Sequence, residues 1–131
     1  MKKLLFVLAF MLLNAPVYGA DIDILMLNKQ DKERNVYSKP IVNINVGDTV
    51  NWIAKSKGHN VEFIKRYGVP EGVGKYKSRL SKDAKYTFKV PGIYAYWCTP
   101  HKSMGMIGFV IVGNNKSNIN SIKKIKFKGK S

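Results

Sequence analysis

The sequence predicts an all-β protein, a Greek-key β-sandwich of antiparallel strands with at most one short C-terminal helix. Apolar and polar residues alternate in several short runs, and glycine or proline turn signals separate these runs. No run keeps a long helical period. These features together are typical of two sheets packed face to face. At 131 residues the chain has room for one such domain.

The expected strands follow one another along the middle of the chain. The first alternates imperfectly, the second alternates cleanly after Pro40, and a Gly47-Asp48 turn leads into a β-branched and aromatic third strand. Pro91-Gly92 separates the last alternating run from two final apolar strands. The predicted strands span residues 21–27, 41–46, 49–54, 61–64, 85–90, 93–98 and 107–112.

Two segments of the chain lack this alternation. The polar, glycine-rich stretch 67–81 is predicted to be a loop. Residues 114–131 are rich in Asn, Ser and Lys. They are expected to form a basic tail with one short helix near 117–124 and a frayed, mobile end. The predicted domain therefore spans 21–113.

Residues 1–20 have the layout of a secretory signal peptide. Lys2 and Lys3 precede an apolar run, Leu4 to Leu13, that is too short to span a bilayer. Small residues follow, and cleavage is expected after Gly19 or Ala20. We therefore expect a soluble periplasmic protein with no stable membrane insertion once the signal is removed.

The charge balance is strongly basic. The net charge is +15, and removal of the signal with its two lysines leaves +13. Such a charge favours an acidic partner. Nucleic acid is excluded by the predicted export and by the lack of a basic recognition element interleaved with stacking aromatics.

The chain has one cysteine, Cys98, whereas exported proteins usually pair their cysteines in disulfides. A lone cysteine can be buried, joined to a second chain, reactive or bound to a metal, and the count alone favours burial. Its neighbours favour a metal. Cys98, His101 and Met106 stand in the connection between the last two strands, and His59 stands in a loop entering an earlier strand. One thiolate, two imidazoles and a thioether are the ligands of a blue copper electron-transfer site, so the sequence predicts one copper ion and no catalysis.

Other classes of protein fit these four residues less well. Separately, His59 would more often lie on a loop surface and Met106 in a core. A zinc site would take a fourth strong ligand in place of a thioether. A copper enzyme would need further histidines, and the chain has only two. A copper carrier or chaperone, which usually exposes Met- or His-rich tracts, is kept as the alternative.

Both motifs resemble those of the pseudoazurins, bacterial members of the cupredoxins. The resemblance rests on Gly58-His59-Asn60-Val61-Glu62, Cys98-Thr99-Pro100-His101 and Met104-Gly105-Met106, and runs from Asp21 to Gly113. It implies a monomeric periplasmic electron carrier. Trp97 departs from the family, where a lysine is common, and the tail is too short for the family's two terminal helices.

The resemblance also implies roles around the metal. The Asn60 N–H is expected to bond the Cys98 sulfur while its side chain ties the ligand loops together with Thr99. His101 is expected to reach the surface through Pro100 and Met104. Lysines around His101 would attract an acidic redox protein, and a copper nitrite reductase is the first candidate. Two of these lysines, Lys29 and Lys77, match positions that are basic in the family. The other two, Lys57 and Lys102, stand next to the histidine segments.

Overall fold

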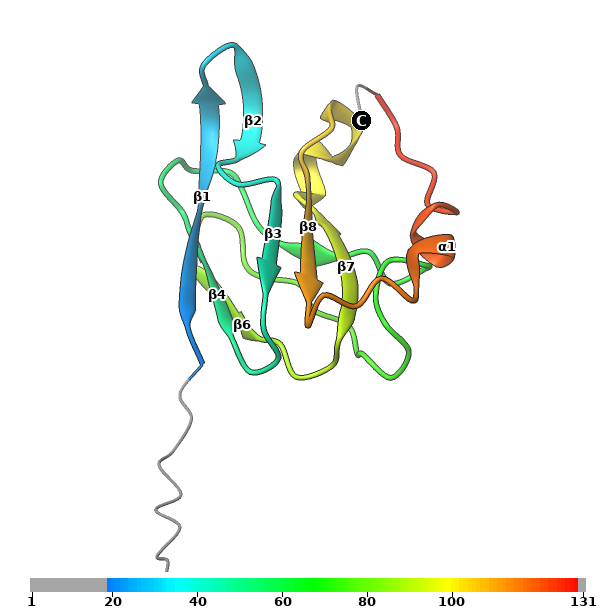
Figure 1. Ribbon diagram of the computed structural model, residues 1–131. Helices are drawn as coiled ribbons and strands as arrows, with labels where there is room; N and C mark the ends of the chain where they lie inside the picture. The colour runs from blue at the N-terminus through cyan, green and yellow to red at the C-terminus, as the bar shows by residue number, and fades with distance from the viewer. Residues whose placement is uncertain (1–18, 130–131) are drawn as a thin grey trace, which may run out of the picture.

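The computed structural model describes residues 19–129 (Figure 1). The predicted signal peptide lies outside this range except for its last two residues. No helix within residues 19–129 is long and apolar enough to cross a membrane.

The described chain forms two four-stranded sheets, which confirms the predicted all-β sandwich. The first has the order β2-β1-β4-β6 and the second β3-β8-β7-β5. The first sheet contains β1 (Asp21–Gln30), β2 (Glu33–Tyr37), β4 (Thr49–Ile53) and β6 (Ala84–Thr87). The second contains β3 (Ile41–Ile44), β5 (Glu62–Phe63), β7 (Gly92–Trp97) and β8 (Ile107–Val112). A 3₁₀ turn, η1 (Thr99–Met104), and a short helix, α1 (Ile119–Ile122), complete the structure.

The pairing of the strands differs from the prediction in two ways. β1 pairs with β4, and β3 with β8, in parallel, so the sheets are mixed and not purely antiparallel. β2 was not predicted, because it begins with three consecutive polar residues, Glu33 to Asn35, and so shows no alternation. It forms by antiparallel pairing with β1, where Met26 stands opposite Tyr37. Backbone pairing outweighs the weak local pattern here.

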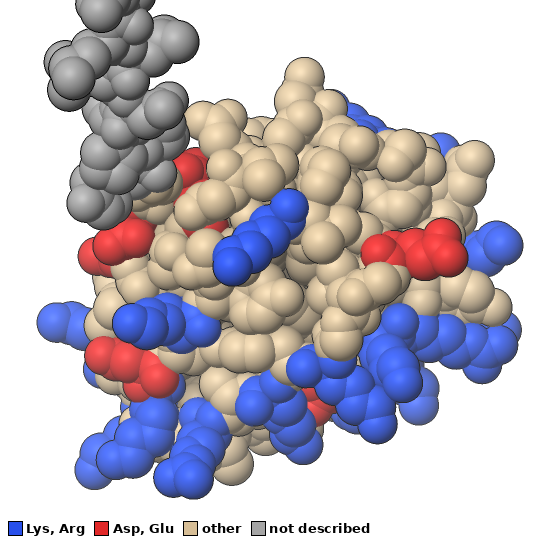
Figure 2. All heavy atoms as spheres, turned by 90° about the horizontal axis from the view of Figure 1, so that it is seen from below, with Lys and Arg blue, Asp and Glu red and all other residues tan. Residues whose placement is uncertain are grey.

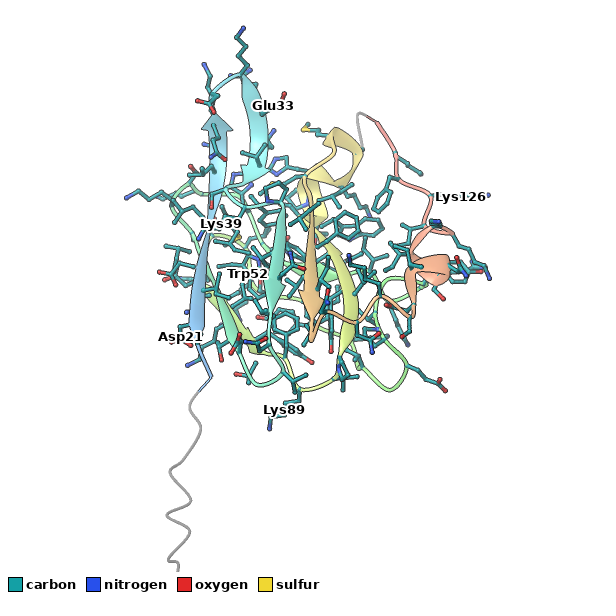
Figure 3. The ribbon with its side chains drawn as sticks, in the orientation of Figure 1. Asp21, Glu33, Lys39, Trp52, Lys89 and Lys126 are labelled. Atoms are coloured by element: carbon teal, nitrogen blue, oxygen red, sulfur yellow. The ribbon has the colours of Figure 1, made fainter. Side chains whose placement is uncertain are left out.

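The main core lies between the two sheets. Fully buried Trp52 lies between them (Figure 3) and contacts the ring of Tyr96 edge-on at 5.3 Å between centroids. β7 and β8 run side by side, and Tyr96 faces Gly108. A β-carbon at Gly108 would collide with the Tyr96 ring, so the packing requires glycine there.

A second, smaller core covers the outer face of the second sheet. Ile93 and Ala95 of β7 are buried on this side against Ile122 of α1. Beyond α1 the chain runs back along the sheet, where Phe127 packs edge-on against Phe109. The tail is therefore packed against the sheet up to residue 129, and not frayed as the sequence predicted. The apolar residues among the tail's lysines anchor it, because a sheet face must be covered to exclude water.

Candidate metal centre

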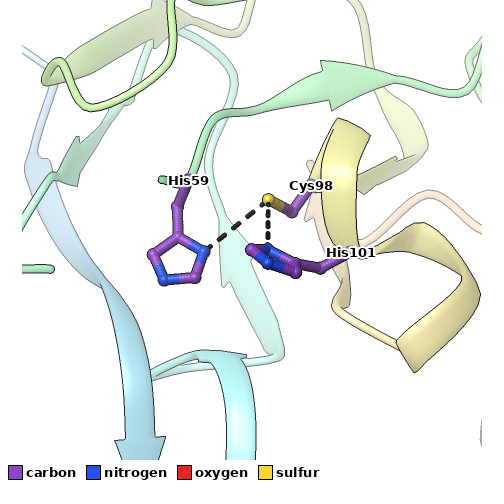
Figure 4. Close-up of side chains that lie close together, drawn as sticks. All are labelled: His59, Cys98 and His101. Atoms are coloured by element: carbon purple, nitrogen blue, oxygen red, sulfur yellow. Dashed lines mark hydrogen bonds between the residues drawn. The ribbon is translucent and has the colours of Figure 1, made fainter. Parts of the chain in front are cut away.

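Two loops at one end of the sandwich bring three donor atoms together (Figure 4). His59 precedes β5, Cys98 directly follows β7, and His101 lies in η1. The Cys98 Sγ lies 3.3 Å from Nδ1 of His101 and 3.7 Å from Nδ1 of His59. All three donors lie within 4.8 Å of one another. Metal bonds of about 2.0–2.3 Å to imidazole and thiolate would fit between them.

Met106 is held beside these donors by the turn of the ligand loop. The Cys98 N–H donates to the Met106 carbonyl at 3.0 Å, and the Met106 N–H donates to the His101 carbonyl at 3.2 Å. Gly105 makes this return possible with a φ of 80°, which favours glycine. Met106 is buried in the same core cluster as Cys98. The donor set therefore fits copper, as the sequence predicted.

A hydrogen bond sets the tautomer of His59. Its Nε2 lies 2.7 Å from Oδ1 of Asn28. An amide oxygen can only accept, so Nε2 carries the proton and the Nδ1 lone pair faces Cys98. The role of Asn28 was not predicted, because it lies 31 residues from His59 in sequence and no local pattern marks it.

Asn60 joins the two ligand loops through its side chain. Its side-chain amide donates to Oγ1 of Thr99 at 2.8 Å, and its Oδ1 accepts from the Thr99 N–H at 2.8 Å. Its backbone N–H also lowers the pKa of the Cys98 thiol, against the effect of burial. Asn60 is 1% exposed, so these bonds are shielded from water. One buried side chain thus fixes the distance between the two loops.

Glu62 extends this network and was missed as a functional candidate. Its carboxylate accepts from Oγ1 of Thr99 and from Nε1 of Trp97, both at 2.9 Å, and lies 3.4 Å from Nζ of Lys77. Burial tends to raise the pKa of Glu62, but the hydrogen bonds from Trp97, Thr99 and Lys77 outweigh it and lower the pKa. An ionised carboxylate therefore orients Thr99 and Trp97 on either side of Cys98.

Protonation of the metal-free donors follows from their burial. Burial raises the pKa of the Cys98 thiol, opposed by N–H groups of Asn60 and His101. Burial lowers the pKa of His59, as does the nearby His101, and burial also lowers the pKa of His101. The unfolded chain therefore binds more protons than the folded chain near the ordinary histidine pKa of 6.5. The metal-free protein should lose stability as the pH falls through that value.

Copper binding at neutral pH is expected to release about one proton per ion, because the thiol must ionise while both imidazoles are already neutral. Isothermal titration of metal-free protein in two buffers with different ionisation enthalpies measures this release. Cys98→Ala should release none. Equal proton release from that variant would contradict the protonation state assigned to Cys98.

The residues predicted to dock a partner are exposed to solvent. His101 is partly exposed, whereas His59 and Cys98 are fully buried, so His101 is the candidate ligand that reaches the surface. The exposed set comprises Lys29, Lys57, Lys77, Pro100, Lys102 and Met104, and Lys77 also forms an ion pair with Glu62. Basic side chains are not confined to this end: in Figure 2, viewed from the opposite end, they gather along one edge.

Comparisons with known proteins point the same way. The model for copper-binding proteins of the plastocyanin/azurin family matches residues 24–113, which include all four candidate ligands. Pseudoazurin of Paracoccus pantotrophus is 37% identical over 123 residues, covering 94% of this chain and 84% of that protein. The crystal structure of native pseudoazurin from Hyphomicrobium denitrificans has a TM-score of 0.79 and 34% identity, covering 84% of this chain and 88% of that one. A Synechococcus plastocyanin is 40% identical over 94 residues, covering 63% of this chain and 67% of the plastocyanin.

Proposed function

The chain belongs to the plastocyanin/azurin family of copper-binding proteins, and from this premise we propose that it is an exported carrier of single electrons in the periplasm. Similarity to pseudoazurins confirms the resemblance seen in the motifs, and it makes the chain a copper electron-transfer protein and not an enzyme. We assign the copper ligands to His59, Cys98, His101 and Met106. The observation that carries this assignment is the convergence of a thiolate and two imidazoles beside a buried thioether.

The described residues favour electron transfer over copper delivery. A copper ion in such a donor set supplies a reversible Cu(I)/Cu(II) couple. Asn28 fixes the ring of His59, and Asn60 fixes the spacing of the two loops. Donors held by hydrogen bonds move little when the charge at the centre changes. A copper carrier would instead need ligands that open easily to release the ion.

Adding copper(II) to metal-free protein tests this proposal. One ion per chain should produce an intense blue colour that ascorbate bleaches and oxidation restores. A colourless copper complex, or rapid loss of copper to a weak chelator, would favour the carrier alternative.

Met106→Leu is expected to keep the blue colour and raise the reduction potential, because a weak thioether donor to the oxidised ion would be lost. Cyclic voltammetry measures the change. Met104→Leu is the matched control, since Met104 is 56% exposed and should leave the potential unchanged. A Met106 variant with bound copper but no blue colour would contradict the assignment of Met106.

The partner is proposed to be an acidic redox protein, such as a copper nitrite reductase, that docks transiently over His101. Lys29, Lys57 and Lys102 would steer its approach. The exposed residues Pro100 and Met104 would form a small apolar contact around His101, through which the electron would pass. Lys77 contributes less, because Glu62 partly neutralises it. The protein itself is proposed to act as a monomer.

Replacing Lys57 and Lys102 together with glutamate should lower the association rate with an acidic partner by about tenfold at low salt and flatten its salt dependence. Stopped-flow electron transfer measures the rate. The matched control replaces Lys85 and Lys89, which are exposed on and after β6; Figure 3 places Lys89 at the opposite end. An equal loss in both variants would mean that net charge alone governs the kinetics.

A further inference from the structure

The folded tail creates a groove on the outer face of the second sheet, hereafter the tail groove. Its apolar side is formed by Ile64, Trp97 and Ile125. Tyr67 and four cations complete the lining: Arg66, Lys123, Lys124 and Lys126. Its cavity volume is about 670 Å³. None of these eight lining residues is a candidate copper ligand or belongs to the proposed His101 surface.

The tail groove continues toward the ligand loop. A second hollow shares Trp97 and Lys126 with it and reaches the proposed His101 surface at Pro100 and Lys102. Nζ of Lys102 lies over the Trp97 ring, 5.2 Å from its centroid. The Trp97 indole is held in place by its hydrogen bond to Glu62. The two hollows therefore adjoin each other at Trp97 and Lys126.

The cations of the tail groove have no carboxylate partner within residues 19–129. The ion pair formed between described residues is that of Lys77 with Glu62, which lies outside the groove lining. Arg66 and Lys124 instead lie over the ring of Tyr67, at 5.1 and 5.6 Å from its centroid. Like charges gathered without a counter-charge repel one another, and a bound anionic chain would relieve that repulsion.

We propose that the tail groove binds an acidic segment of a partner protein, an extended chain with several carboxylates and one large apolar side chain. The carboxylates would pair with the cations of the rim, and the apolar side chain would cover Trp97 and Ile125. A bilayer is a poorer match, because membrane-bound surfaces present protruding apolar residues and these lie in a concavity. The site goes beyond the proposed function, since it needs no copper.

The test follows the indole N–H resonances of the ¹⁵N-labelled chain in its Cu(I) form. The probe is a peptide of about ten glutamates with one central phenylalanine, added at low salt. The Trp97 resonance should shift, together with the backbone resonances of 64–67 and 123–126, while that of buried Trp52 should stay fixed. The same peptide with glutamines in place of the glutamates should not bind.

Lys123→Glu with Lys124→Glu should weaken peptide binding by about tenfold, whereas the control pair Lys85→Glu with Lys89→Glu should weaken it much less. Equal weakening in both pairs would overturn the proposal in favour of net charge. Shifts confined to Lys57 and His101 would place the peptide elsewhere and overturn it as well. Vesicles of phosphatidylserine that move the groove resonances when the peptide does not would indicate a lipid surface instead. Repeating the titration without metal keeps this result separate from any failure of the copper assignment.

Discussion

Replacing Cys98 with alanine is expected to abolish the intense visible absorption of the copper-loaded protein. The blue colour of such a centre arises from charge transfer between a thiolate sulfur and copper(II), and Cys98 is the only cysteine of the chain. Absorption and electron paramagnetic resonance spectra of the variant should show either no bound copper or an ordinary weakly coloured complex with the remaining imidazoles.

The fold should survive this substitution. Cys98 is fully buried but small, and removal of one sulfur leaves a cavity that costs on the order of 1 kcal/mol. Thermal unfolding of the metal-free forms controls for misfolding. A variant that folds and still turns blue would show that Cys98 is not the source of the colour.

Asn60→Ala is expected to lower the free energy of unfolding of the metal-free protein by about 2–4 kcal/mol. The substitution removes the bonds between Asn60 and Thr99 and leaves the Thr99 N–H without its acceptor, each loss costing about 1–3 kcal/mol when buried. Chemical denaturation measures the change in unfolding free energy. The blue band should shift as well, because the two ligand loops lose the link that fixes their spacing.

Asn35→Asp is the matched control for this prediction, because aspartate tolerates the left-handed backbone at this position (φ 52°) and removes the amide donor. Asn35 also bonds the ligand loop, through Nδ2 and the Met104 sulfur at 3.4 Å, but this contact is exposed to solvent. Its loss should cost less than about 0.5 kcal/mol. Similar stability losses from the two variants would mean that the Asn60 bonds are no more important than a surface contact.

The sequence by itself determined the chemistry of the centre. Cys98, His101 and Met106 lie within one short loop, so their spacing is a local property that can be read without knowledge of the fold. The alternating runs likewise predicted the sandwich, because a strand with one face in the core must repeat every second residue. Most strands lie within a few residues of their predicted bounds.

Only the tertiary structure decided which distant residues support that centre. Asn28 reaches His59 across 31 residues, and Glu62 reaches Trp97 across 35, with no pattern that links either pair in sequence. β2 depends on backbone pairing with β1, which its own side chains do not encode. The tail folds back because β7 presents a second apolar face to cover. Such contacts arise from the packing of whole layers, and a local pattern therefore cannot reveal them.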